Sequence, residues 1–223
     1  MALSKEYISF FKELSANNTS EWFNANKKRY EQHVKAPFHQ LVQEVIVLMK
    51  KMDPQITLEP KDSVFRINRD IRFSNDKSPY KTYMAAVVSR GGRKDTATPG
   101  IYFQADGGSI SIFGGSYEPD KENLARIRKA IAKDPKRVNK ILQGKKFTDL
   151  FGKLGGDRYK ILPPEFKAVA ETTPAMYNKS FHYEKEYKGA SYVTRTDLAK
   201  FIVDHYKTAQ EWNTFLMEAL GKK

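Results

Sequence analysis

GIYFQADGGSISIFGG, residues 100–115, joins two apolar runs through a pair of glycines. Residues 100–106 and 109–115 each have the length of a β-strand, and Gly107-Gly108 suits the tight turn of a β-hairpin. The connections around this hairpin are short or loop-like and show no helical pattern. We therefore predict antiparallel pairing, because parallel strands need a longer crossover.

Three further segments have strand patterns, so we predict a central antiparallel sheet of about five strands. These segments are residues 64–72, 83–90 and 180–188. In SVFRINRDIRFS (63–74) polar and apolar residues alternate. Because side chains alternate between the faces of a strand, one face of this strand is predicted to carry Phe65, Ile67, Arg69, Ile71 and Phe73.

Apolar residues recur at helical spacing on both sides of this strand region. The pattern predicts helices near residues 4–15, 19–34, 37–52, 120–133 and 194–220, with a short helix over 134–144. Asn18, with Glu21 three residues later, resembles a capping box for the second helix. Asp120 is the predicted cap of the fourth.

The fold class is therefore predicted to be α+β, with helices packed around the central sheet. The 223 residues suit one domain, residues 1–223. It would have a helical part over 1–54, a sheet core over 63–115 and a mixed, mainly helical part over 120–223. We find no internal repeat and no linker of low complexity.

The composition limits the compartment and the chemistry. The chain has no cysteine, which excludes disulfides, thiolate metal sites and a cysteine nucleophile and is compatible with a reducing compartment. Neither a signal peptide nor a membrane-spanning run is evident. We therefore expect a cytoplasmic protein without a membrane partner. The sequence predicts no oligomeric state.

The net charge of +13 allows an anionic partner, and most of the excess lies in residues 120–160. Thirteen Lys and Arg against five Asp and Glu give this segment a net charge of +8. Its cations Arg126, Lys129 and Lys133 lie opposite the apolar face of a predicted helix that has no aromatic residue for base stacking. A solvated helix face is therefore favoured, and nucleic acid is expected to bind weakly at most.

RINRDIRFSNDKSPYK, residues 66–81, has five basic and two acidic residues. Arginine on the apolar face of a strand needs partners for five N–H donors. The turn-rich continuation could bring further cations to the same place, and guanidinium groups suit phosphate and carboxylate oxygens. A cross-strand ion-pair ladder is the structural alternative. The predicted ligand-binding residues are Arg66, Arg69, Asp70, Arg72, Asp76, Lys77, Tyr80 and Lys81.

Other kinds of site have less support. The four histidines show no metal-ligand spacing, so no metal site is predicted. FGGSYEPDKENL (113–124) has glycines before a helix, but Asp120 at the cap would oppose an anion. No G-x-S-x-G motif and no serine–histidine pair is evident. The sequence identifies neither a cofactor nor a catalytic residue.

The block FRINRDIRFSNDKSPYKT (65–82) resembles the signature of the bacterial family catalogued as domain of unknown function 2461. LSANNTSEWFNANKKRYEQHVKAPF (14–38), GIYFQAD, FGGSYEPD, LARIRKAI and LPPEF are similar to other parts of that family, in order. The likeness covers most of residues 4–181. It departs at ETTPAMYNKSF (171–181), where Thr173 replaces a histidine before Pro174, so no role of that histidine carries over. The resemblance implies a shared fold and polar block, but no activity, substrate or cofactor.

Three functions stay open from the sequence. The favoured one is binding of an anionic, phosphorylated small molecule at residues 66–81. The second is an enzyme acting on a phosphate ester or nucleic acid, with Asp70 or Asp76 as a base or metal ligand. The third is a protein-interaction module with a basic docking helix. If both aspartates pair with arginines and leave no cavity, neither ligand binding nor catalysis at this block is supported.

Overall fold

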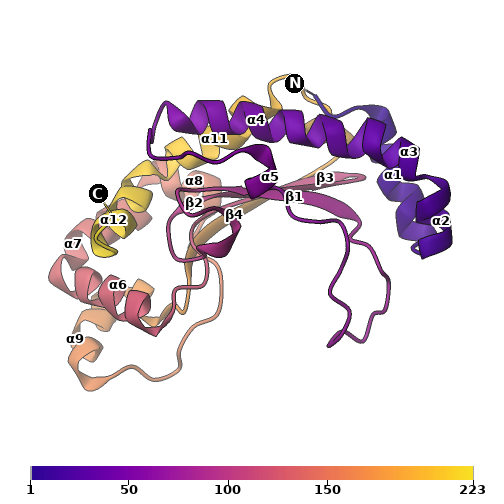
Figure 1. Ribbon diagram of the computed structural model, residues 1–223. Coiled ribbons are helices and arrows are strands. Elements are labelled where there is room, and N and C mark those ends of the chain that lie inside the picture. The colour runs from indigo at the N-terminus through magenta and orange to yellow at the C-terminus, as the bar shows by residue number, and fades with distance from the viewer. Residues whose placement is uncertain (1, 223) are drawn as a thin grey trace. The chain divides into compact units, whose positions relative to one another are not determined.

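The computed structural model describes residues 2–222, and its sheet has four antiparallel strands in the order β1-β2-β3-β4 (Figure 1). The strands are β1 (Tyr83–Val88), β2 (Gly100–Asp106), β3 (Ser109–Ser116) and β4 (Phe181–Lys188). The predicted α+β class and the hairpin over residues 100–115 are confirmed, since β2 and β3 are neighbours joined by Gly107-Gly108.

The prediction of a fifth strand over residues 64–72 is wrong. This segment makes only the isolated antiparallel bridges Val64–Ala86 and Asn68–Tyr80. Two physical causes are visible. Pro79 has no N–H to donate to a ladder. In addition, the Asp70 and Asp76 carboxylates accept hydrogen bonds from backbone N–H groups two residues later, and such local bonds compete with strand pairing.

The chain divides into two compact units. Unit 1 comprises the residues up to Val88, Tyr102–Ile112 and Glu186–Val203. Unit 2 comprises Ser89–Ile101, Phe113–Lys185 and the residues from Asp204 onward. β2, β3 and β4 each have residues in both units. A single domain over residues 1–223 stays a prediction.

Unit 1 contains the N-terminal helices. They are α1 (Lys5–Ala16), α2 (Ser20–Ala25), α3 (Lys27–Tyr30), the π-helical turn η1 (Glu31–Lys35), α4 (Ala36–Lys50) and α5 (Pro60–Ser63), with α10 (Ala190–Val193) later in the chain. Long α4 passes over the sheet (Figure 1). The Tyr7 hydroxyl is fully buried and donates to the Ala105 carbonyl at 2.8 Å. This hydrogen bond attaches α1 to β2.

The second predicted helix, over residues 19–34, differs from the structure in two ways. Its N-cap is Thr19, whose hydroxyl accepts from the Trp22 N–H at 3.2 Å, and not Asn18. It is also interrupted at Asn26, whose side-chain amide donates to the Trp22 carbonyl at 2.9 Å. The side chain of Asn26 thus satisfies a carbonyl at the end of α2, and the chain then turns into α3.

Unit 2 contains a second set of helices around its own core. They are η2 (Gly92–Lys94), α6 (Lys121–Lys133), α7 (Pro135–Leu142), α8 (Lys145–Phe151), α9 (Pro164–Thr172), η3 (Pro174–Tyr177) and α12 (Gln210–Ala219). Asp120 caps α6 as predicted, whereas α8 and α9 were not predicted. Trp212 and Phe181 belong to the buried apolar cluster of this unit. The Trp212 indole N–H donates to the Phe181 carbonyl at 3.1 Å, and this hydrogen bond connects α12 to β4.

The predicted helix over residues 194–220 is two helices, α11 (Leu198–Thr208) and α12. The break falls at Ala209. The Thr208 hydroxyl donates to the Asp204 carbonyl at 2.9 Å, and this i−4 bond bends helices. None of the helices within residues 2–222 is long and apolar enough to cross a bilayer.

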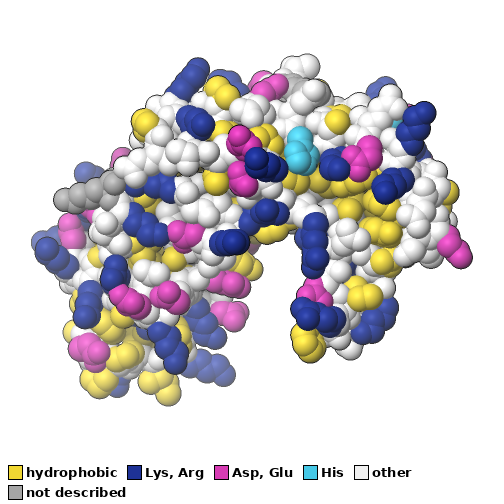
Figure 2. All heavy atoms as spheres, viewed as in Figure 1, with side chains coloured by type: hydrophobic (Ala, Val, Ile, Leu, Met, Phe, Trp, Pro, Cys, Tyr) yellow, Lys and Arg dark blue, Asp and Glu magenta, His cyan; other side chains and the backbone are white. Residues whose placement is uncertain are grey.

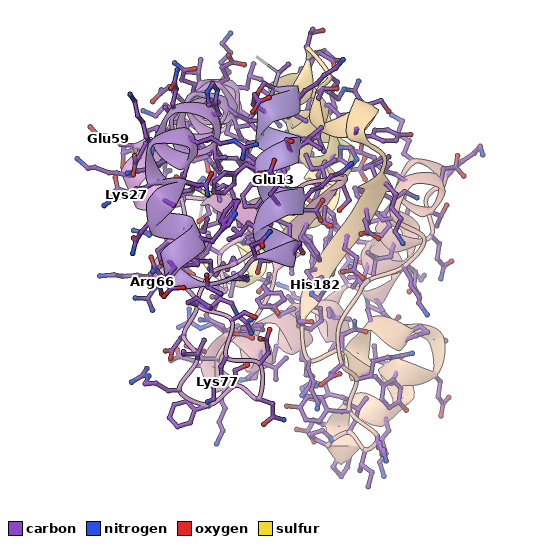
Figure 3. All side chains as sticks on the ribbon, turned by 90° about the vertical axis from the view of Figure 1, so that its right-hand side faces the viewer. Glu13, Lys27, Glu59, Arg66, Lys77 and His182 are labelled. Carbon is purple, nitrogen blue, oxygen red and sulfur yellow. The ribbon has the colours of Figure 1, made fainter. Side chains whose placement is uncertain are left out.

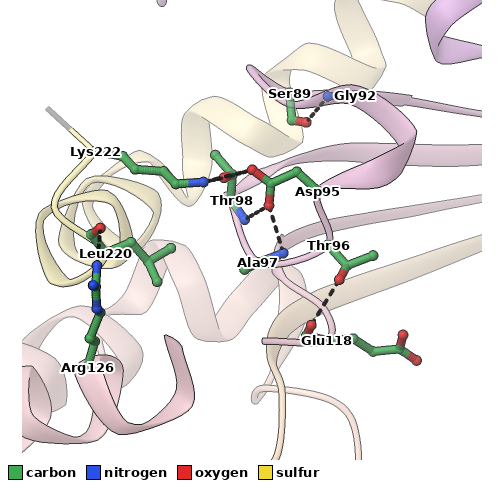
Figure 4. Close-up of polar contacts among 10 residues, drawn as sticks. All are labelled: Ser89, Gly92, Asp95, Thr96, Ala97, Thr98, Glu118, Arg126, Leu220 and Lys222. Atoms are coloured by element: carbon green, nitrogen blue, oxygen red, sulfur yellow. Dashed lines mark hydrogen bonds and ion pairs between the residues drawn. The ribbon is translucent and has the colours of Figure 1, made fainter. Parts of the chain in front are cut away.

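The connection between β1 and β2 is fixed to the C-terminal segment by Asp95 (Figure 4). Its carboxylate accepts from the Lys222 ammonium at 2.7 Å and from the Thr98 N–H at 2.9 Å, and it also bonds the Thr98 hydroxyl. Burial alone would raise the pKa of Asp95, but the hydrogen bonds from Lys222 and Thr98 outweigh burial and lower the pKa to about 2.

This ion pair predicts a pH-dependent contribution to stability. A carboxyl whose pKa is lower in the folded state stabilises the fold above its unfolded pKa, and the contribution disappears as the pH falls through the folded value. We therefore expect wild type to lose on the order of 1–2 kcal/mol relative to Asp95→Asn between about pH 4 and pH 2. Urea unfolding of both proteins across this range measures the difference, and parallel curves would contradict it.

Candidate functional site

The basic block lies in the long connection between α5 and β1, which Figure 1 shows as a loop without helix or strand. Its two arms run antiparallel. The Arg69 N–H donates to the Pro79 carbonyl at 2.9 Å, and the Lys81 N–H donates to the Ile67 carbonyl at 2.8 Å. The loop is therefore an irregular hairpin, and its tip is formed by the residues between these bonds.

The base of the loop is held against the helices of unit 1. The Asn18 side chain donates to the Tyr80 carbonyl at 2.9 Å and accepts from the Tyr80 N–H at 3.1 Å. The Tyr80 ring stacks on Phe23 with centroids 4.0 Å apart. Asn18 was interpreted from the sequence as a helix cap, so its function as a clamp on the loop was missed.

Two of the three arginines are paired within the loop. Arg72 binds both oxygens of Asp70, at 3.0 and 2.7 Å. Arg69 binds Asp76 and also donates to the Ser74 hydroxyl at 3.3 Å. Hydrogen bonds from Ser78, followed by those from Arg69, lower the pKa of Asp76 below its usual range. The Arg72 side chain lowers the pKa of Asp70.

Arg66 and Lys81, at the base of the loop, make no ion pair with a carboxylate of the described residues, although the charge of Arg66 contributes to the lowered pKa of Asp70. Within residues 2–222 neither side chain makes an ion pair or a hydrogen bond. Lys81 instead lies 5.5 Å over the Phe65 ring. Burial, and next the charge of Arg66, lower the pKa of Lys81. The loop thus places two like charges close enough to repel each other.

A cavity of about 580 Å³ opens beside the loop. Five of the eight predicted residues line it: Arg69, Asp70, Asp76, Tyr80 and Lys81. Arg66, Arg72 and Lys77 do not. Figure 3 shows Arg66 at the base of the loop and Lys77 towards its tip, where the Lys77 ammonium donates to the Ile71 carbonyl at 3.0 Å. Lining residues that the sequence did not indicate are Ser15, Asn18, Ser78, Thr82 and Tyr83.

The predicted apolar face of the block is only partly formed. Ile67 is buried, but Phe73 is 95% exposed and stands beside the Arg72 guanidinium. Arg69 keeps a quarter of its side chain exposed while it pairs with Asp76. Strand alternation therefore held for the first arm and failed at the tip, where the chain turns.

This arrangement suits binding better than acid–base chemistry. A general base needs a pKa near the working pH, whereas the pKa values of Asp70 and Asp76 are lowered and both carboxylates are engaged by arginines. The cavity remains open despite these pairs. Ligand binding and catalysis at this block would both lose support if the two aspartates were paired and no cavity were left. Only the first of these conditions is met.

The basic segment 120–160 contains many cations that already have partners. Arg126 pairs with Glu122, Arg137 with Glu218, and Lys145 with Asp149. Arg128 is buried under the Tyr159 ring, with its guanidinium carbon 4.5 Å from the ring centroid. Figure 2 shows acidic groups among the basic ones on the face drawn there. These pairs fit the solvated-face interpretation.

Two further sequence observations have a structural counterpart. Thr173, which precedes Pro174, is fully buried, and its hydroxyl accepts from Asn139 at 3.1 Å. The statement that no serine–histidine pair is evident needs correction, because the Ser180 hydroxyl lies 3.0 Å from His182 Nδ1. Ser180 and His182 are two residues apart at the start of the strand predicted over 180–188. This spacing places both side chains on one strand face and could have indicated the pair.

Comparison with known proteins identifies one family. The family described as conserved hypothetical protein (DUF2461) matches residues 6–215. No curated protein and no solved structure matches the chain. The matched range includes the whole basic block and its cavity.

Proposed function

The chain belongs to the family of conserved hypothetical proteins DUF2461, and we propose that it binds an anionic, phosphorylated small molecule at the block Arg66–Lys81. The observation that carries this proposal is the pair of cations without a counter-ion. Burial and, next, the charge of Arg66 lower the pKa of Lys81, and neither cation has a carboxylate within ion-pair distance among residues 2–222. An anion placed between them would replace a repulsion by two attractions.

The eight residues of the block have different functions in this proposal. Lys81 contacts the phosphate from the cavity wall as a point charge, and Arg66, which lies outside that wall at the base of the loop, contacts it with its planar fork. Tyr80 lines the cavity and is clamped by Asn18. The Arg69–Asp76 pair and the Lys77–Ile71 contact fix the shape of the loop, whereas Arg72, which pairs with Asp70, is mostly exposed. The loop is thereby ordered before the ligand arrives, which lowers the entropic cost of binding.

Calorimetric titration with pyrophosphate and AMP tests the site directly. A charge-assisted hydrogen bond contributes about 1.5–3 kcal/mol, so Arg66→Gln and Lys81→Gln should each weaken binding roughly tenfold or more. Arg72→Gln is the matched control. It removes the same charge from the same loop, but this guanidinium is exposed and already held by Asp70. We expect it to change the affinity less than about threefold.

Two results would refute binding at this block. One is tight binding that survives the double variant Arg66→Gln/Lys81→Gln. The other is failure of every phosphorylated compound in a thermal-shift panel to stabilise the wild type, although saturating ligand must raise the stability of the state it binds.

The other partners predicted from the sequence have a smaller place in this proposal. We propose that nucleic acid binds weakly and without sequence preference, through scattered phosphate contacts whose affinity falls with salt. We also propose a cytoplasmic location, with which a chain lacking cysteine is compatible. No observation favours the docking-helix function over ligand binding.

A further inference from the structure

A second group of reactive side chains lies in unit 2, on the residue just before β4 and on the first residues of that strand. Ser180, His182 and Glu184 are spaced by two residues, and strand geometry places such residues on one face. The Ser180 hydroxyl is 3.0 Å from His182 Nδ1, and His182 Nε2 is 4.0 Å from a Glu184 carboxylate oxygen. Serine and histidine are both buried, whereas about half of the Glu184 side chain is exposed. Figure 3 marks His182 on this strand.

All three side chains line one cavity of about 690 Å³. Its wall also includes three aromatic residues, two lysines and two further acidic residues: Phe113, Tyr117, Tyr159, Lys121, Lys179, Glu118 and Asp157. The Tyr117 ring centroid is 5.3 Å from that of His182. The cavity therefore combines a hydrogen-bonded hydroxyl, flat aromatic surfaces and charged groups of both signs, and the hydroxyl–imidazole pair is the part that attack on a carbonyl group requires.

The backbone at Gly155-Gly156 is shaped around this pair. A Cβ atom at Gly156 would lie 2.0 Å from the Ser180 oxygen, and one at Gly155 would lie 2.6 Å from His182 Nε2. Gly156 also has φ of +83°, which favours glycine. The Gly155 N–H donates to the His182 carbonyl at 2.9 Å. These two glycines permit a close approach that holds the imidazole beside the hydroxyl.

The tautomer of His182 decides which group donates in its hydrogen bond with Ser180. Nδ1 can accept from the Ser180 hydroxyl only when the imidazole is neutral and carries its proton on Nε2, on the side of Glu184. Burial lowers the pKa of His182, and the Glu184 carboxylate opposes this effect. The neutral form, which is the form able to accept a proton, therefore prevails at neutral pH.

We propose that Ser180 is a nucleophile activated by His182, and that this second site hydrolyses carboxylic esters with a flat aromatic group. The Ser180 oxygen forms a bond to the carbonyl carbon, and its proton passes to Nδ1. The C–O bond to the leaving alcohol breaks, and that oxygen takes the proton from Nδ1. Water then attacks the acyl-serine by the same route, releasing the acid and restoring Ser180, so that ester and water give acid and alcohol.

The aromatic preference follows from the wall of the cavity. The Tyr159 ring is already in contact with the Arg128 guanidinium and the Lys179 ammonium, whereas the ring of Tyr117, which is 53% exposed, is accessible to a ligand. Flat rings stack on such surfaces. Lys121 supplies positive charge for the oxyanion that forms when the carbonyl is attacked, whereas Lys179 is paired with Asp157 at 3.7 Å. This inference is independent of anion binding at residues 66–81, because the two cavities share no residue.

Labelling of the full chain with diisopropyl fluorophosphate tests the nucleophile without a known substrate. The Ser180 oxygen would form a bond to phosphorus, fluoride would leave, and the serine proton would pass through His182 to solvent. We expect one adduct per chain, mapped to Ser180 by peptide mass spectrometry. His182→Gln should slow labelling by about 100-fold or more, the effect of losing a general base. Ser111→Ala, a change at another buried serine in the sheet, should label at the wild-type rate.

Hydrolysis of p-nitrophenyl acetate provides the second measurement. The wild type should release an initial burst of about one p-nitrophenolate per chain, and Ser180→Ala should abolish it while circular dichroism shows an unchanged fold. The proposal is overturned by absence of an adduct on Ser180 under conditions that label trypsin, by labelling that His182→Gln does not slow, or by turnover that persists in Ser180→Ala. If Ser180→Ala does not fold, mapping the wild-type adduct decides alone.

Discussion

Replacing Asn18 by alanine is expected to lower the free energy of unfolding by about 2–4 kcal/mol, because it removes both hydrogen bonds that hold the backbone of Tyr80. The donor and the acceptor of Tyr80 lie in a buried residue and would lose their partners. Unpaired polar groups in such surroundings cost more than the average hydrogen bond contributes. Urea denaturation monitored by circular dichroism measures the change.

The neighbouring Asn17 offers a matched control. Its side chain makes one exposed hydrogen bond, to the Glu13 carbonyl at 2.9 Å, so Asn17→Ala should cost less than about 1 kcal/mol. Asn18→Ala should also weaken the binding of pyrophosphate, since the clamp positions the wall of the anion cavity. Equal losses of stability in the two variants would show that Asn18 does not hold the loop.

Gly115→Ala is expected to destabilise the fold by roughly 2–5 kcal/mol, through backbone strain and overpacking together. Gly115 has φ of +91°, and a Cβ there would lie 2.4 Å from the Phe181 carbonyl oxygen of β4. The obstacle is backbone in a neighbouring strand, which cannot rotate away as a side-chain tip can. A thermal melt should show a clearly lower midpoint than that of wild type.

Gly108→Ala is the control for this prediction. Gly108 occupies the β2–β3 turn, its φ is not positive, and a Cβ there would meet no atom within 4 Å. We expect a change in unfolding free energy of less than about 1 kcal/mol. If Gly108→Ala destabilises as much as Gly115→Ala, the strain and contact described for Gly115 are not the cause.

Much of the fold was predictable from periodicity alone. The hairpin and the helices over 4–15, 37–52 and 120–133 have long, regular patterns and local caps, and the structure confirms them within two residues at each end. The break at Ala209 was not predictable, because the apolar stripe continues through it. The hydroxyl that bends the helix there, Thr208, resembles any polar residue in the sequence.

The candidate sites show what a one-dimensional pattern conceals. Polar and apolar residues alternate over 64–72 as they do in a strand. However, the carboxylates of Asp70 and Asp76 accept hydrogen bonds from nearby backbone N–H groups, and the chain turns there. The pairing of Arg69 with Asp76 depends on that turn. Asn18 is 62 residues from Tyr80, so its contact is a property of the tertiary structure. Ser180 and His182 are close in sequence, yet only their geometry distinguishes a hydrogen-bonded pair from an ordinary strand.

The isolated bridge between Val64 and Ala86 has a consequence for self-association. β1 is an outer strand of the sheet, and such a strand exposes unpaired amide groups that can template pairing with another molecule. The Phe65 N–H donates to the Ala85 carbonyl at 2.9 Å. The start of the basic loop therefore covers part of the free edge of β1. At the opposite edge of the sheet, β4 carries four charged residues among its last five, EKEYK. The loop that covers β1 and the charged residues of β4 thus disfavour pairing of either edge strand with another molecule.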